Sequence, residues 1–109
     1  MAIQFLNSPL YGDNVKIEFG NSADLQIYHD GSNSYINEIG TGALYIQSNI
    51  INLRSSTGEW FMEGIADGAV NLYHNNVKKF ETTSAGVTVT GNVGIGSFPT
   101  SKLQLEQSI

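Results

Sequence analysis

The stretch that decides the fold is Gly86-Val87-Thr88-Val89-Thr90-Gly91-Asn92-Val93-Gly94-Ile95-Gly96. Its Val and Ile residues share one parity, and Thr or Gly fill most of the other, which is the period of a β-strand with alternating faces. Gly91-Asn92 interrupts the pattern as a turn would, because both residues accept positive φ at little steric cost. Leu103 and Leu105 continue the apolar parity. The pattern predicts a narrow ribbon with one apolar face, which needs a partner to cover it.

The composition favours strands and surfaces that meet copies of themselves. The chain has 109 residues, enough for one domain, and 40% of them are hydrophobic, but only 14% are charged, against about 25% in typical soluble domains. Asn, Ser, Thr, Gln and Gly replace the missing charge. These residues suit strand faces and tight turns, and identical uncharged surfaces can meet without repulsion. We therefore expect an all-β protein with almost no helix.

Charge and cysteine content exclude several classes of partner. The net charge is −5, and the five Lys and Arg residues are spread along the chain. Such a distribution offers no basic patch for phosphates, so we expect no nucleic-acid partner. No run approaches the roughly 18 apolar residues of a membrane span, and the start shows no signal-peptide pattern, so we expect no membrane partner either. Cysteine is absent, which excludes disulfides and thiolate zinc sites.

Alternating apolar residues predict short strands along the rest of the chain. Asp30-Gly31 is a dipeptide favoured in type I′ hairpin turns and predicts a hairpin with a return strand near 34–38. The segment 59–63 has apolar residues on both parities, and we expect it to form a fully enclosed strand, with one turn of helix as the alternative. A parity change after Ser48-Asn49 indicates a bulge or corner. The remaining alternating segments centre on Ile3 and Phe5, on 15–19, 25–27, 44–46, 51–53, 70–72 and 77–80.

An internal repeat divides the chain. Gln26-Ile27-Tyr28-His29-Asp30 aligns without gaps with Asn71-Leu72-Tyr73-His74-Asn75 at an offset of 45 residues, and Tyr35 then aligns with Phe80. We interpret the chain as a single β-rich domain over 1–109, with the repeat near 23–36 and 68–81 and a fibre-like stretch at 86–109. Two copies fall short of the three that a self-sufficient solenoid needs. Partner chains would have to supply the missing burial.

Two motifs carry a resemblance to a known family. Gly91-Asn92-Val93-Gly94-Ile95-Gly96, followed by Pro99 and Lys102-Leu103, resembles a signature of tailed-bacteriophage tail fibres and tailspikes. There it usually lies just ahead of a self-cleaving trimerisation chaperone; no such domain follows Ile109, so removal, a fragment, or another route to trimerisation all stay open. The Tyr28-His29-Asp30-Gly31 and Tyr73-His74-Asn75-Asn76 segments resemble repeats in structural proteins of marine phages.

The resemblance implies an intertwined homotrimeric fibre, of the triple β-helix or β-prism kind, in a virion that is extracellular when functional. It implies other virion tail proteins as partners, and a host glycan or surface protein as receptor. The trimer core would consist of Leu72, Val87, Val89, Val93 and Ile95. Composition alone leaves open a monomeric β-sandwich, which would be a carbohydrate-binding module. A third reading is a tailspike-like glycan hydrolase.

The candidate site residues have ordinary structural readings beside the functional ones. His29 and His74 hold equivalent repeat positions, where three-fold symmetry could gather either into a metal site, but packing beside the neighbouring Tyr is the favoured reading. Glu59, Glu63 and Asp67 could supply a carboxylate pair for glycoside hydrolysis, yet nothing positions an acid against a base. Gly91, Gly94 and Gly96 run in the reverse order of a dinucleotide loop. We expect no catalytic residue and no cofactor.

Tyrosines supply the remaining functional signal. Tyr28, Tyr45 and Tyr73 occupy the polar parity of their segments. An exposed Tyr can stack on a sugar ring or anchor a protein contact. The favoured reading is that these rings cover the strand surface or seal contacts between chains, with receptor contact as the alternative.

Overall fold

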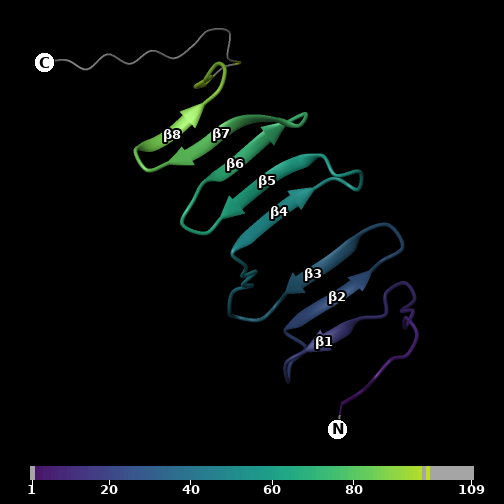
Figure 1. The fold of residues 1–109 in the computed structure, drawn as a ribbon. Helices are drawn as coiled ribbons and strands as arrows, with labels where there is room; N and C mark the ends of the chain where they lie inside the picture. The colour runs from purple at the N-terminus through teal and green to yellow at the C-terminus, as the bar shows by residue number, and fades with distance from the viewer. Residues whose placement is uncertain (1, 97, 99–109) are drawn as a thin grey trace, which may run out of the picture. The chain divides into compact units, whose positions relative to one another are not determined.

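The computed structural model describes residues 2–96 and 98, which form two compact units, Met1–Ile46 and Gln47–Ile109. Unit 1 holds a three-stranded antiparallel sheet and unit 2 a five-stranded one, each with its strands in chain order (Figure 1). The described residues contain no helix, and hence none that could cross a membrane. The expected all-β class is confirmed. The strands of unit 1 are β1 (Ile17–Phe19), β2 (Leu25–His29) and β3 (Ser34–Glu38), and those of unit 2 are β4 (Ile50–Arg54), β5 (Trp60–Ile65), β6 (Val70–His74), β7 (Val77–Thr83) and β8 (Gly86–Val89).

Strands form where an alternating segment also finds a neighbour to pair with. The predicted return strand at 34–38 is confirmed as β3, hydrogen-bonded to β2. The segments 3–5 and 44–46 alternate equally well but form no strand. The fibre-like stretch is a strand only as far as Val89, where its pairing with β7 ends, so Val93 and Ile95 lie beyond the sheet. Alternation reports which face a side chain would take, whereas a strand also requires backbone hydrogen bonds to a partner. Leu103 and Leu105 lie outside the described residues.

The two central hairpins close in different ways. The type I′ prediction at Asp30-Gly31 is wrong: β2 and β3 are joined by the four residues Asp30–Asn33, in which the Asp30 amide donates to the Asn33 carbonyl over 3.0 Å. A two-residue loop with positive φ at both positions, as type I′ requires, joins β6 to β7 at Asn75 (φ 47°) and Asn76 (φ 66°). Positive φ at both loop positions, which a type I′ turn needs, is therefore found at Asn75-Asn76 and not at Asp30-Gly31.

The Asp30 carboxylate replaces that turn chemistry in the first hairpin. Its Oδ1 accepts the backbone N–H groups of Asn33 at 2.7 Å and Ser32 at 2.9 Å, and its Oδ2 accepts the Tyr35 hydroxyl at 2.9 Å. These hydrogen bonds to the charged form hold the pKa of Asp30 below its usual value, Asn33 contributing most, and the bond to Asp30 raises the pKa of Tyr35. A short acidic side chain thus organises the whole loop.

The strand register shows the repeat to be longer than the sequence indicates. Ile17 pairs with Ile27 as Met62 pairs with Leu72, at the same offset of 45 residues. The turns also match, since Ala23 donates to Gly20 over 3.1 Å and Gly68 to Ile65 over 3.0 Å. The repeat is therefore a three-stranded unit, β1-β2-β3 in one copy and β5-β6-β7 in the other.

A β-bulge changes the third strand of the second copy. The register between β6 and β7 shifts after Leu72, so Phe80 faces Leu72 whereas Ile36 faces Ile27. The alignment of Tyr35 with Phe80 is thus corrected, because the extra residue moves Phe80 into the place of Ile36. A bulge inserts one unpaired residue and transfers the following side chains to the other face.

Neither sheet encloses a hydrophobic core. No hydrophobic side chain among the described residues is buried; the buried residues are two amides, Gln26 and Asn71, which occupy equivalent positions of the repeat. The expectation of a fully enclosed strand at 59–63 is wrong, since Phe61 in β5 is 52% exposed. β5 is central in its sheet, but hydrogen bonding to both neighbours satisfies its edges and leaves its faces uncovered. Burial has to come from something that packs on a face.

We predict that Asp30→Asn destabilises the chain in a pH-dependent way. Because folding lowers the pKa of Asp30, the charged cap stabilises the fold above the unfolded value of about 3.9, and its contribution disappears as pH falls through the lower folded value. The difference in melting temperature between native chain and variant, measured by circular dichroism at fixed protein concentration, should be largest near neutral pH and shrink towards pH 2.

Asp67→Asn is the matched control, since Asp67 lies in a turn at φ 56° and its carboxylate accepts no hydrogen bond from the described residues. At pH 7 its melting temperature should fall less than that of Asp30→Asn, because Asp67→Asn removes no such cap. An Asp30→Asn difference that stays constant from pH 7 to pH 2 would contradict the proposed role of the charged cap.

Candidate functional site

One face of the five-stranded sheet carries a continuous row of hydrophobic side chains. The register places them directly opposite one another from β4 to β8, and residues paired in this way lie on the same face. Leu53 is 51%, Leu72 43% and Val89 39% exposed. We call this row the unit 2 ladder; it consists of Leu53, Met62, Leu72, Phe80 and Val89.

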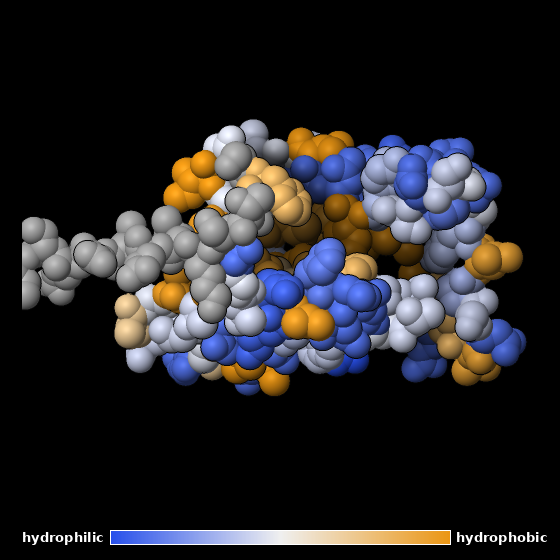
Figure 2. Space-filling model, turned by 90° about the horizontal axis from the view of Figure 1, so that it is seen from above, coloured by the Kyte–Doolittle hydropathy of each residue, from blue (hydrophilic) through white to orange (hydrophobic). Residues whose placement is uncertain are grey.

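The three-stranded sheet carries the equivalent row. Ile17, Ile27 and Ile36 stand opposite one another and form what we call the unit 1 ladder. Their exposed fractions run from 36% for Ile17 to 63% for Ile36. Orange hydrophobic side chains accordingly reach the surface beside hydrophilic ones in Figure 2. Each unit thus presents a thin apolar face that its own strands do not cover.

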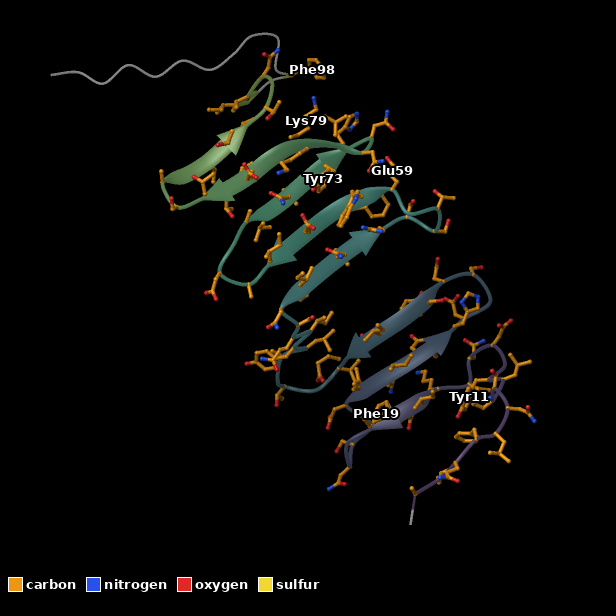
Figure 3. All side chains as sticks on the ribbon, in the orientation of Figure 1. Tyr11, Phe19, Glu59, Tyr73, Lys79 and Phe98 are labelled. Atoms are coloured by element: carbon orange, nitrogen blue, oxygen red, sulfur yellow. The ribbon has the colours of Figure 1, made fainter. Side chains whose placement is uncertain are left out.

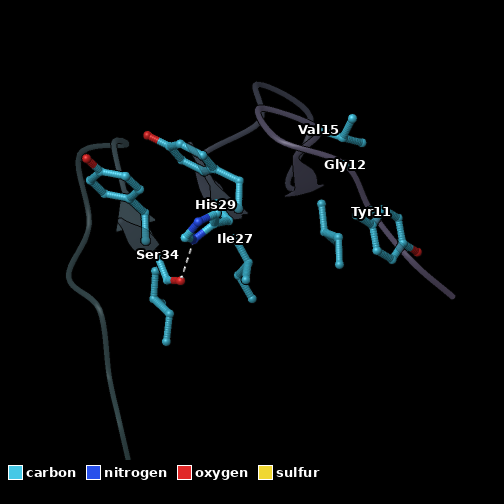
Figure 4. Close-up of a pocket in the computed structure, with 10 residues that line it drawn as sticks. Tyr11, Gly12, Val15, Ile27, His29 and Ser34 are labelled. Carbon is cyan, nitrogen blue, oxygen red and sulfur yellow. Dashed lines mark hydrogen bonds between the residues drawn. The ribbon is translucent and has the colours of Figure 1, made fainter. Parts of the chain in front are cut away.

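In unit 1 the ladder forms the floor of a groove of about 450 Å³ (Figure 4). The stretch that leads into β1 supplies Tyr11 and Val15, and the far ends of β2 and β3 supply His29 and Ser34. The His29 Nδ1 and the Ser34 Oγ lie 2.9 Å apart (Figure 4). No Asp, Glu, Lys or Arg lines the groove. The groove is therefore a concave surface without acidic or basic side chains other than the His29 imidazole; three tyrosines, Tyr11, Tyr28 and Tyr35, also line it.

The opposite faces carry polar rows. Glu18, Gln26 and Asn37 stand opposite one another in unit 1, and Asn52, Glu63, Asn71, Glu81 and Thr88 do so in unit 2. The Asn71 Nδ2 donates to the Glu63 Oε1 over 3.0 Å, while the buried Asn71 Oδ1 has no hydrogen-bond partner among the described residues. Lys78 donates to Glu81 over 2.8 Å, and this bond raises the pKa of Lys78. Sequence reasoning did not single out the two buried amides, although the repeat aligns Gln26 with Asn71.

Aromatic rings on these faces stack on each other and on cations. Tyr28 stacks on Tyr35 with centroids 4.7 Å apart, and the Lys16 ammonium lies 4.7 Å from the Tyr28 ring centre. In unit 2, Trp60 stacks on Tyr73 at 5.7 Å, with the Arg54 guanidinium 3.7 Å from the Trp60 ring centre. Such contacts stabilise a strand surface by roughly 0.5–1.5 kcal/mol each. The rings of Tyr28 and Tyr73 thus pack against their neighbours.

Tyr45, by contrast, is 78% exposed. It lies outside the strands, in a segment with no stacking or cation contact to the described residues. Of the three tyrosines predicted as receptor contacts, Tyr45 is therefore the one whose ring is not stacked against a neighbour. Tyr73, labelled in Figure 3, lies on β6 of the five-stranded sheet.

The predicted trimer-core residues fall into two groups. Leu72 and Val89 belong to the unit 2 ladder, and Val87 pairs with Thr82 in β7 and is 60% exposed. Val93 is half-buried and Ile95 is 77% exposed, both beyond the end of β8. The structure therefore brings three of the five together on one sheet and does not place the other two on it.

The other candidate residues are not brought into one site. His29 and His74 are exposed and lie in different units. Within residues 2–96 and 98, no three His, Cys, Asp or Glu side chains form a group that could hold a metal ion. Glu63 belongs to the polar row through its bond to Asn71, Glu59 precedes β5, and Asp67 lies in the turn after it.

Comparison of the chain with protein-family models, with curated proteins and with solved structures finds no match.

Proposed function

We propose that the chain is a structural and adhesive segment of a homotrimeric β-fibre, of the kind found in phage tail fibres and tailspikes. One observation carries the proposal: the hydrophobic ladder of each unit is exposed, and no hydrophobic side chain among the described residues is buried. A soluble chain whose apolar rows lie uncovered gains free energy when other copies cover them. Three copies around one axis could turn every ladder inward.

The magnitude of this gain indicates that both ladders are needed. Fully burying a large hydrophobic side chain yields about 1.5–3 kcal/mol, and about half of that remains where a chain leaves half of the side chain exposed. The five residues of the unit 2 ladder would then contribute roughly 5 kcal/mol per chain, or about 15 kcal/mol for three chains. Bringing three chains together costs about 4–15 kcal/mol for each of two association steps, or about 8–30 kcal/mol in all, so the unit 2 ladder alone offsets only the lower half of that range. We therefore infer that unit 1 contributes to the same assembly.

The opposite faces suit exposure on a fibre. They carry the polar rows, whose members are amides, carboxylates and a threonine, together with stacked rings that neighbouring side chains already contact. A face of this kind is satisfied by water and by its own contacts, so it gains little from association. The division of each sheet into one hydrophobic and one polar face supports a fibre in which the chains share a hydrophobic interior and expose a polar exterior.

The assignment to a phage fibre rests on the sequence resemblance of the stretch after Gly91 and of the two Tyr-His segments. The register adds that Tyr28-His29 and Tyr73-His74 hold the same places in two three-stranded repeats, as expected of a repetitive shaft. For the adhesive role we favour Tyr45, because its ring is open. A monomeric sandwich would instead have to bury both ladders inside one chain.

The first prediction is the mass of the native assembly. Sedimentation equilibrium at micromolar concentration and pH 7.5 should give three times the chain mass of 11.8 kDa. A folded species of one chain mass would overturn the homotrimer and favour the sandwich. A folded dimer would also contradict the proposal, since it does not provide a three-fold axis.

The second prediction concerns the face that is covered. Val89→Asp places a charge in the unit 2 ladder, where burial on assembly would be costly. The concentration at which the trimer dissociates should rise at least about 100-fold, since each of the three chains loses roughly half of the 1.5–3 kcal/mol of a buried side chain and, in addition, buries an unpaired carboxylate at a cost of at least about 1–3 kcal/mol.

Thr90→Asp is the matched control, because it introduces the same charge at the next residue, which is exposed and whose amide bonds to the Lys79 carbonyl at 2.9 Å. Its trimer should match the native one. Equal weakening by both variants would show that net charge, and not the ladder, controls assembly.

A further inference from the structure

The groove of unit 1 has features of a contact surface that the unit 2 ladder lacks. It is concave, its floor is the row Ile17, Ile27 and Ile36, and its walls include Tyr11 and the His29 imidazole (Figure 4). The equivalent histidine of the second repeat, His74, is exposed at the end of β6 and does not line this groove. A group that fills the groove would remove His29 from water.

A second copy of this chain is the occupant that the groove fits. Every copy carries a row of matching geometry in Met62, Leu72 and Phe80 as well as the unit 1 row itself, so a copy can offer apolar side chains at the strand spacing of the groove. The chain has a net charge of −5, yet the groove lining carries no carboxylate and no amine. Two copies can therefore meet there without bringing like charges together.

The His29 ring has no hydrogen bond to a carboxylate among the described residues, although the neighbouring Asp30 attracts a positive charge on it. From β3 the ring faces the Ser34 hydroxyl, which is neutral. In the segment before β1, the Asp13 carboxylate lies beside Gly31, and the Lys16 ammonium lies over the Tyr28 ring in a cation–π contact. The adjacent carboxylate, Asp30, already accepts two backbone amides and the Tyr35 hydroxyl.

We propose that acid releases this contact: a second copy fills the groove while His29 is neutral, and protonation of His29 weakens its docking. The inference rests on the homotrimer proposed above and names how its assembly is regulated. A neutral imidazole bonded to Ser34 can be enclosed by apolar side chains at modest cost, whereas an imidazolium in the same place loses its hydration. Asp13 and Asp30 offset part of that cost, because both carboxylates lie on the loop side of the groove.

The direction follows from proton linkage. Histidine changes its charge between about pH 5 and 8, so in acid the free chains take up protons that the assembled chains exclude. If docking excludes one proton per chain, each unit of pH lowers the trimer association constant by up to about 1000-fold, since three sites act together. Trimer should therefore predominate at pH 7.5 and dissociate near pH 5.5.

The test is sedimentation equilibrium of the full chain at pH 7.5 and 5.5, with circular dichroism to show that the sheets persist. His29→Gln, which keeps a side chain able to bond Ser34, should remain trimeric at both pH values. The matched control His74→Gln removes the equivalent histidine outside the groove and should dissociate in acid as the native chain does. A native trimer that persists at pH 5.5 overturns the acid-release proposal and leaves the trimer intact, whereas a native monomer at pH 7.5 overturns the trimer.

Two further outcomes would decide against His29. Acid dissociation that is the same in His29→Gln as in the native chain, or that disappears in His74→Gln, overturns its assignment. If His29→Gln does not fold, the pH dependence of the native association constant takes its place: a slope approaching three protons per trimer supports the proposal, and a slope near zero overturns it.

Discussion

Hydrogen bonding between strands satisfies the edges of a sheet and leaves both faces to be covered by something else. This constraint governs the whole chain. β5 and β6 have a neighbour on each side, yet Phe61 and Leu72 remain about half exposed. Each sheet is a single layer, and a domain is normally stable because a second layer packs on the first. The hydrophobic side chains of each sheet are therefore left without a second layer from their own strands.

The two units share the same three-stranded arrangement. In each, an amide is buried in the middle of the polar face, at Gln26 and at Asn71, while hydrophobic residues line up on the other. Aromatic rings and cations cover part of the polar face by stacking. This inverts the usual arrangement, in which the buried face of a sheet is the apolar one.

Local differences between the copies decide what each can do. The short loop between β6 and β7 places Lys78 opposite Tyr73, where the first copy has Tyr35 opposite Tyr28, and Tyr73 stacks on Trp60 instead. The bulge after Leu72 then moves Phe80 into the ladder. The Asp30 loop and the approach to β1 give unit 1 a groove with a histidine in its wall. The same three-stranded scaffold thus presents a groove in one copy and a bulged strand in the other.

Much of the secondary structure follows from the sequence alone. The alternation at Leu25–Ile27 and Val70–Leu72, the return strand at Ser34–Glu38 and the 45-residue repeat all depend on short-range pattern, because alternation and turn residues act within a few positions. The all-β class and the polar or apolar sense of each face follow from the same pattern. The alternation of apolar and polar residues also predicted that Leu72, Val87 and Val89 are the apolar side chains of their strands.

Only the tertiary structure decided the pairing. Alternation at Ile3, Leu44 and Ile95 resembles that of the true strands, but no described strand lies beside these residues to bond with them. The register between strands, and with it the bulge after Leu72 and the hydrophobic and polar rows, depends on how neighbouring strands align. A shift of one residue in that alignment exchanges the two faces of a strand. A one-dimensional pattern specifies which side chains seek cover, whereas the position of each strand beside its neighbours determines which of them stand together and remain uncovered.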